Sequence, residues 1–184
     1  MRIAVALCLA VLSVAAAKPA PHKPPKAMLD GLFARLAKSE SPEDAKPIED
    51  EIATLFVQSG SASVDLLMAR GTAALAGGDD DDARKLFDAV TAIAPDFAEG
   101  WHRKAEMQSD SGDDEGAMVS LQKTVTLNPR QFGAMNELAG MLEEYGNKAG
   151  ALALYKRALA LDPQLEAATK RVRALEKDVE GQGI

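Results

Sequence analysis

The chain has 184 residues, 47% of them hydrophobic, and a formal net charge of −7 at pH 7. This hydrophobic content excludes a wholly disordered chain, and the length is that of one domain. The negative charge argues against a nucleic-acid partner, because phosphates require a basic surface. Cys8 is the only cysteine, which excludes both a disulfide framework and a thiolate-ligated zinc site.

Residues 1–17 have the pattern of a signal peptide. Arg2 provides a positive start, an apolar run follows, and Ala15 to Ala17 form a small-residue cleavage site. We therefore expect cleavage after Ala17 and a periplasmic or secreted mature chain with no membrane span. Two alternatives are less favoured: the apolar run is short for an uncleaved anchor, and Leu7 stands before Cys8 where a lipidation signal needs a small residue.

Residues 18–26 and 27–62 precede the most regular part of the chain. The first segment holds four prolines and three lysines, which predicts a hydrated linker, with a basic arm for an acidic partner or anionic membrane as the alternative. The second predicts a degenerate N-terminal helix pair that caps the fold. Ser41, Pro42 and Asp44 have the spacing of a helix start, whereas Pro47 predicts either a kink or a later start.

Residues 64–163 repeat with a period of 34 residues, which predicts three helical pairs at 64–97, 98–131 and 132–163. Small residues recur where paired helices must approach closely, glycines where a first helix ends, and prolines after the second helix. The aligned columns are Gly71, Ala105 and Ala139; Gly78, Gly112 and Gly146; Ala83, Ala117 and Ala151; and Pro95, Pro129 and Pro163. Residues 164–180 have an apolar stripe opposite a charged face, which predicts a capping helix.

This pattern resembles the tetratricopeptide repeat (TPR) family. The residues that carry the resemblance are Trp101 and Ala105 in the second repeat and Leu138, Ala139, Ala151, Tyr155, Ala158 and Pro163 in the third. The stretch at 59–67 is similar to one that opens the repeats in a group of small exported bacterial TPR proteins. The resemblance implies an all-α, right-handed superhelical solenoid of antiparallel helix pairs that works as a binding scaffold.

In the family, five positions of each first helix line a concave groove, and they can be carried over to this chain. The predicted partner-binding residues are Asp65, Met68, Thr72, Glu99, His102, Glu106, Asp110, Asn136, Glu143 and Glu144. The set is mostly acidic and contains no lysine, so it does not match the clamps that grip a carboxylate terminus. We expect a protein or peptide partner with a basic or amphipathic segment. The alternative is a self-associating structural protein of the cell envelope, although a monomer is favoured.

We expect no catalytic residue, cofactor or metal. The chain has two histidines, one of them in the linker, and it has no phosphate-binding glycine loop and no nucleophile elbow. The acidic runs at 79–82 and 110–115 could suggest calcium. We instead assign them to helix starts, where the positive end of the helix dipole favours carboxylates.

Overall fold

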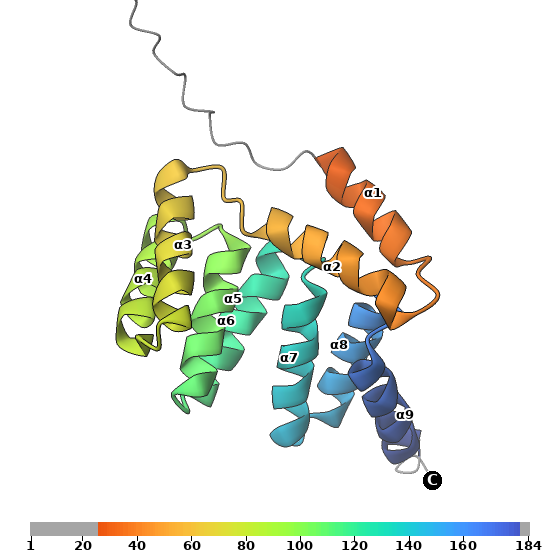
Figure 1. Ribbon diagram of the computed structural model, residues 1–184. Coiled ribbons are helices and arrows are strands. Elements are labelled where there is room, and N and C mark those ends of the chain that lie inside the picture. The colour runs from red at the N-terminus through yellow and green to blue at the C-terminus, as the bar shows by residue number, and fades with distance from the viewer. Residues whose placement is uncertain (1–25, 181–184) are drawn as a thin grey trace, which may run out of the picture.

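The computed structural model describes residues 26–180, and that part of the chain is entirely helical (Figure 1). The predicted signal peptide, the linker up to residue 25 and the segment 181–184 lie outside the described residues. The helices are α1 (Lys26–Leu36), α2 (Pro42–Phe56), α3 (Ala62–Ala76), α4 (Asp80–Ile93), α5 (Ala98–Asp110), α6 (Asp114–Leu127), α7 (Phe132–Glu144), α8 (Lys148–Leu161) and α9 (Glu166–Glu180). No helix in this range is long and apolar enough to cross a membrane.

The predicted helical pairs are present and stack side by side. Helices α3 and α4, α5 and α6, and α7 and α8 pack as hairpins, and α4, α6 and α8 each also contact the helix that follows (Figure 1). The starts of α5, α7 and α9 are 34 residues apart. Helix α9 therefore occupies the place of the first helix of a fourth, incomplete repeat, which confirms the predicted all-α repeat fold with a C-terminal capping helix.

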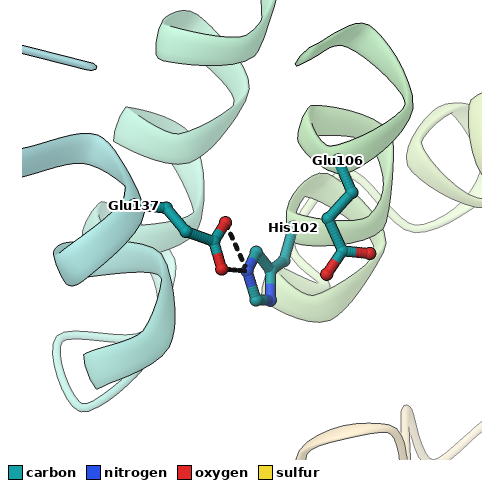
Figure 2. Close-up of side chains that lie close together, drawn as sticks. All are labelled: His102, Glu106 and Glu137. Atoms are coloured by element: carbon teal, nitrogen blue, oxygen red, sulfur yellow. Dashed lines mark hydrogen bonds and ion pairs between the residues drawn. The ribbon is translucent and has the colours of Figure 1, made fainter. Parts of the chain in front are cut away.

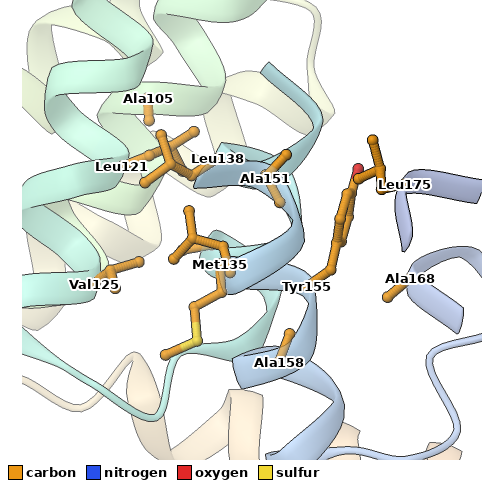
Figure 3. Packing of buried hydrophobic residues seen from close by; sticks show 13 residues of the cluster. Ala105, Leu121, Val125, Met135, Leu138, Ala151, Tyr155, Ala158, Ala168 and Leu175 are labelled. Carbon is orange, nitrogen blue, oxygen red and sulfur yellow. The ribbon is translucent and has the colours of Figure 1, made fainter. Parts of the chain in front are cut away.

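The small-residue columns lie at the helix contacts, as expected. Ala83, Ala117, Ala139 and Ala151 are fully buried, and Ala105 is nearly so. A larger apolar side chain follows each alanine of the first set by one helical turn. Figure 3 shows one of them, Tyr155, between α8 and the side chains of Ala168 and Leu175 on α9. The capping helix thus covers apolar surface that the last complete repeat would otherwise expose.

The three turns that join the two helices of each repeat share one backbone conformation. Gly78, Gly112 and Gly146 have φ angles of 76°, 78° and 82°, the left-handed conformation predicted for these glycines. The next residue in each case caps the following helix: the side chains of Asp79, Asp113 and Asn147 accept a hydrogen bond from the backbone N–H three residues later. Acidic residues in the first turns of α4 and α6 therefore have the helix-start role assigned to them.

Helices α1 and α2 form a hairpin whose position the sequence did not indicate. Rather than stacking on α3 as an additional repeat, it lies across the turns that precede α7 and α9 (Figure 1). The ring of Phe33 meets Phe132 edge-on, with 6.3 Å between ring centroids. Arg130 pairs with Asp30 at 2.6 Å and places its guanidinium 4.6 Å from the centre of the Phe33 ring. The hairpin is therefore a brace across two inter-repeat turns.

Helix α2 begins at the predicted cap and continues through Pro47. Ser41 accepts a hydrogen bond from the Asp44 N–H, so the predicted cap is confirmed. Helix α2 runs without a break from Pro42 to Phe56 with Pro47 inside it. The loss of one backbone hydrogen bond at Pro47 is offset by packing, since Ile48 and Ile52 are buried in the hairpin core.

A carboxyl pair lies where the hairpin meets the turn before α9. Asp162 is fully buried; its Oδ1 accepts the Gln164 N–H, and its Oδ2 has no hydrogen-bond partner among the described residues. Burial and the neighbouring Asp162 charge raise the pKa of Glu49 on α2, and burial also raises the pKa of Asp162. Because both pKa values are raised in the folded protein, protonation of these carboxyl groups favours docking of the hairpin.

Candidate partner-binding groove

A cavity of about 500 Å³ lies on the groove side of the array, between α5 and α7. Its floor is apolar and consists of Leu75, Ala105, Met107, Leu121 and Met141, whereas its other lining is mainly acidic. The carboxylates that line it are Glu106, Asp110, Asp114, Glu137 and Glu144. An apolar floor beneath a ring of carboxylates suits a partner that is both apolar and cationic.

The repeat itself sets the positions of these side chains. Asp110 and Glu144 are equivalent residues, 34 apart, and each is the last residue of its helix. Both lie just before a left-handed glycine that ends the helix, so both stand at the exposed rim of the cavity. Gly140 on α7 occupies the position that Glu106 occupies on α5. Because Gly140 has no side chain, it leaves room inside the cavity.

A partly buried ion-pair network joins α5 to α7 beside this cavity. His102 Nε2 lies 3.0 Å from Oε2 of Glu137 (Figure 2). On the other side of the ring, Nδ1 lies 3.6 Å from Oε2 of Glu99, a carboxylate that is only 4% exposed. Arg103 bridges Glu99 and Glu106, with N–O distances of 2.9 and 3.0 Å. These contacts tie the second repeat to the third.

The network keeps His102 positively charged at neutral pH. Burial alone would lower the pKa of the imidazole. The hydrogen bonds and charges of Glu137 and Glu99 outweigh burial and raise that pKa to about 10. The imidazolium therefore donates to Glu137, and Gln131 supports the arrangement by donating to Glu99 at 2.9 Å.

His102, Glu106 and Glu137 also bring nitrogen and oxygen atoms within 4.8 Å of one another, a spacing that a transition metal can bridge. Two cationic groups already occupy this space: the imidazolium contacts Glu137, and Arg103 contacts Glu106. A metal would have to displace the proton of His102 first. We therefore describe this group as an ion-pair network.

Several of the predicted partner-binding residues are not open to a partner. Met68, at 4% exposure, belongs to the core of the first repeat, and Glu99 and His102 belong to the buried network. Asp65 accepts hydrogen bonds from the N–H and the hydroxyl of Ser59 and so holds the segment before α3. Periodicity places these residues on the correct helices, but their own contacts remove them from the open surface.

Glu143 and Asn136 also differ from the prediction. Glu143 is 13% exposed and accepts the Arg171 guanidinium from α9, with Nε at 2.8 Å. Asn136 is partly buried, and its Oδ1 has no partner within residues 26–178. Thr72, Asp110 and Glu144 are exposed, and Glu106 is partly exposed, as a groove requires.

Two carboxylates of the cavity were missed by sequence reasoning. Glu137 follows the predicted position Asn136, and Asp114 belongs to the first turn of α6 rather than to a first helix. Asp114 accepts a hydrogen bond from the Tyr145 hydroxyl at 2.8 Å. The acidic run at 110–115 is thus divided among a cavity rim, a helix cap and this hydrogen bond.

A second cavity, of about 360 Å³, lies beneath the hairpin brace. Its lining includes Leu55 and Phe56 of α2, Leu127 at the end of α6, and Phe97 and Arg130 of the inter-repeat turns. It exists because the hairpin folds back over these turns, and no sequence period predicts that fold.

Comparisons with known proteins agree with the repeat architecture. The chain is 33% identical over 112 residues to a TPR repeat-containing protein of Rhizobium etli, a match that covers 61% of this chain. The chain spans about half the length of that relative, because the match covers 55% of it.

Solved structures show the same fold at low sequence identity. The first TPR of Spaghetti (RPAP3), bound to the HSP90 peptide SRMEEVD, has a TM-score of 0.57 and 18% identity, covering 64% of this chain and 93% of that one. The Yersinia enterocolitica type III secretion chaperone SycD, in complex with a peptide of the translocator YopD, has a TM-score of 0.58 and 15% identity, covering 64% and 95%. MamA has a TM-score of 0.58 and 15% identity, covering 78% and 86%.

Two family models, both described as tetratricopeptide repeat, match residues 64–107 and 102–166. Together these matches extend over more than half of the chain, from the third residue of α3 to the first residue of α9. The chain therefore belongs to the tetratricopeptide repeat family.

Proposed function

We propose that this protein is an exported scaffold that holds a basic or amphipathic segment of a partner protein in its concave groove. The observation that carries the proposal is the unbalanced negative charge of the 500 Å³ cavity. Five carboxylates line it, and the cations beside it, Arg103 and the imidazolium of His102, must also neutralise the buried Glu99. A partner with positive charge supplies what the cavity lacks.

The apolar floor adds the second half of the proposal. Met107 and Leu121 are nearly buried, and Leu75 and Met141 are partly exposed at the bottom of the cavity. A segment that is only basic would leave this surface wet, whereas an amphipathic one covers it. Burial of apolar area contributes roughly 25 cal/mol per Å².

The comparisons support peptide binding in general and suggest different partner chemistry here. RPAP3 and SycD are each described with a bound peptide, and both share this fold. The RPAP3 peptide, SRMEEVD, contains three acidic residues. An acidic groove would repel such a peptide, because like charges brought together across an interface cost several kcal/mol. We therefore propose a basic partner for this chain.

A capture experiment tests the proposal with groove variants of the full chain. Asp110→Lys together with Glu144→Lys reverses charge at the cavity rim, where neither side chain pairs with a cation of the described chain. The matched control is Asp80→Lys with Asp81→Lys on the exposed first turn of α4. We expect the wild type and the control to capture the same partner at low salt, and the groove variant to lose it.

The groove proposal would be wrong if the groove variant captured that partner as well as the control did. The salt concentration provides an independent check. Capture of the partner should weaken as salt rises, because exposed charges are screened over about 8–10 Å at ordinary ionic strength. Glu143 is unsuitable for charge reversal because it already pairs with Arg171.

A further inference from the structure

We infer that the groove selects an arginine side chain of the partner, held between the carboxylates of Asp110 and Glu144 with its stem on the apolar floor. This inference rests on the proposed function and names the chemical group that the groove recognises. It follows from which carboxylates are already engaged, from the shape of the cavity, and from a guanidinium pair that the protein itself contains.

Three of the five cavity carboxylates already have partners. Glu106 accepts from Arg103, Glu137 accepts from His102, and Asp114 accepts from the Tyr145 hydroxyl. Asp110 and Glu144 are the remaining two, and neither forms a salt bridge or a side-chain hydrogen bond within the described residues. They are exposed and stand at equivalent positions of neighbouring repeats, so they are free to receive a cation from outside.

The shape of the cavity favours a long cationic side chain over a compact one. Between the rim and the floor lies Gly140, where an added Cβ would meet only the Tyr155 hydroxyl, at 3.6 Å. The floor includes Met107 and Met141, whose flexible side chains adapt to a guest. An arginine buries its three methylene groups against such a floor while its guanidinium remains near the rim.

Two carboxylates from different helices suit a guanidinium better than an ammonium group. The guanidinium is planar and presents five N–H donors in a rigid fork, whereas the lysine ammonium is a strongly hydrated point charge. The protein contains both elements of this arrangement. Arg171 of α9, one residue away from the rim, donates from two of its nitrogens to the two oxygens of the single carboxylate of Glu143. Arg103 places its guanidinium between two carboxylates, those of Glu99 and Glu106. The end of α7 therefore already binds one guanidinium, at Glu143. The next residue, Glu144, is exposed and can bind another.

A peptide selection tests this inference. The full chain is immobilised, and a library of random 12-residue peptides displayed on phage is selected against it at low salt. We expect the enriched peptides to share an arginine beside apolar residues. Changing that arginine to lysine in a synthetic copy should weaken binding several-fold, and changing it to glutamine should weaken it about tenfold, as for loss of a charge-assisted bidentate pair.

Matched protein variants locate the contact. Asp110→Asn with Glu144→Gln removes two charges without changing the shape of the side chains, and it should lower the affinity of the protein for the arginine peptide about tenfold. Asp80→Asn with Asp81→Asn removes two charges from α4 and should leave its affinity unchanged. Circular dichroism of both variants confirms that the fold is retained, since all four side chains are exposed and lie outside the core.

The outcomes separate the inference from the proposed function. Enriched peptides that lack arginine but bind the groove variant less tightly than the control overturn the arginine inference and leave groove binding in place. Peptides whose affinity is the same for both protein variants overturn both. Failure to enrich any peptide above a bare surface overturns both. Enrichment of acidic peptides also overturns both, because the charge argument would then have the wrong sign.

Discussion

Gly71 provides a sharp test of how the paired helices pack. It is buried in α3, and a Cβ built on it would lie 2.6 Å from Cε1 and 2.8 Å from Cζ of Phe87. Carbon atoms in favourable contact are roughly 3.5–4.0 Å apart, so the ring would have to move by about 1 Å. Phe87 is fully buried and has no free space in which to move. Gly71→Ala is therefore expected to overpack the first repeat.

The magnitude follows from two opposing terms. Overpacking a filled core costs about 1–3 kcal/mol, whereas replacing glycine by alanine within a helix returns about 0.8–1.0 kcal/mol. The two terms leave a net loss of about 0–2 kcal/mol in the free energy of unfolding. For a chain of this length, the upper end of that range corresponds to roughly 4–8 °C in the melting temperature.

Gly140→Ala is the matched control, since it makes the same change in α7. Its Cβ would meet only the Tyr155 hydroxyl, at an ordinary contact distance of 3.6 Å. We expect stabilisation by about 0.5–1 kcal/mol, the usual gain of alanine over glycine in a helix. Urea unfolding followed by circular dichroism at 222 nm measures both variants. If Gly71→Ala were as stable as Gly140→Ala, the packing of Phe87 against α3 would be wrong.

Four further predictions follow from buried or terminal positions. Ala117→Leu should destabilise the array by about 1–3 kcal/mol in urea unfolding, because Ala117 is fully buried, whereas the exposed Asp80→Ala should change stability by less than about 0.5 kcal/mol. His102→Gln should lower the free energy of unfolding most below pH 6.5, and this loss should shrink as pH rises toward about 10. The reason is that the pKa of His102 is raised in the folded protein, so the imidazolium stabilises the fold until it is deprotonated. Glu49→Gln should raise stability at pH 8, where two ionised carboxyl groups repel, and the gain should vanish below pH 4.5, which thermal melts across pH would show. N-terminal sequencing of an exported form should begin at Lys18, and an intact Met1 would contradict the predicted cleavage.

Much of the repeat architecture could be predicted from the sequence because each repeat must satisfy the same local constraints. The left-handed turns at Gly78, Gly112 and Gly146 need glycine, and the contact at Ala117 has no room for a larger side chain. Such constraints recur at a fixed interval, so they are visible as columns. Helix α8, the second helix of the predicted pair 132–163, accordingly begins after the turn at Gly146 and ends two residues before Pro163.

The hairpin brace could not be predicted because it depends on contacts distant in sequence. Phe33 and Phe132 are almost a hundred residues apart, and neither belongs to a periodic column that marks the contact. Which side chains of the groove are open to a partner could not be predicted either, because this also depends on contacts between separate helices. The family resemblance placed Glu99, His102 and Glu143 on the groove side, but the ion-pair network and Arg171 engage them, so they are not open to a partner.

The most direct test of the account is to locate a bound segment on the protein surface. The full chain is labelled with ¹⁵N and titrated with the arginine peptide that the selection provides, while amide signals are followed by NMR. Gly140 is the reporter, because it lines the cavity between the rim and the floor. We predict that the Gly140 signal and those of its neighbours on α5 and α7 shift in proportion to occupancy. Shifts confined to α9 or to the hairpin brace, with Gly140 unchanged, would contradict groove binding.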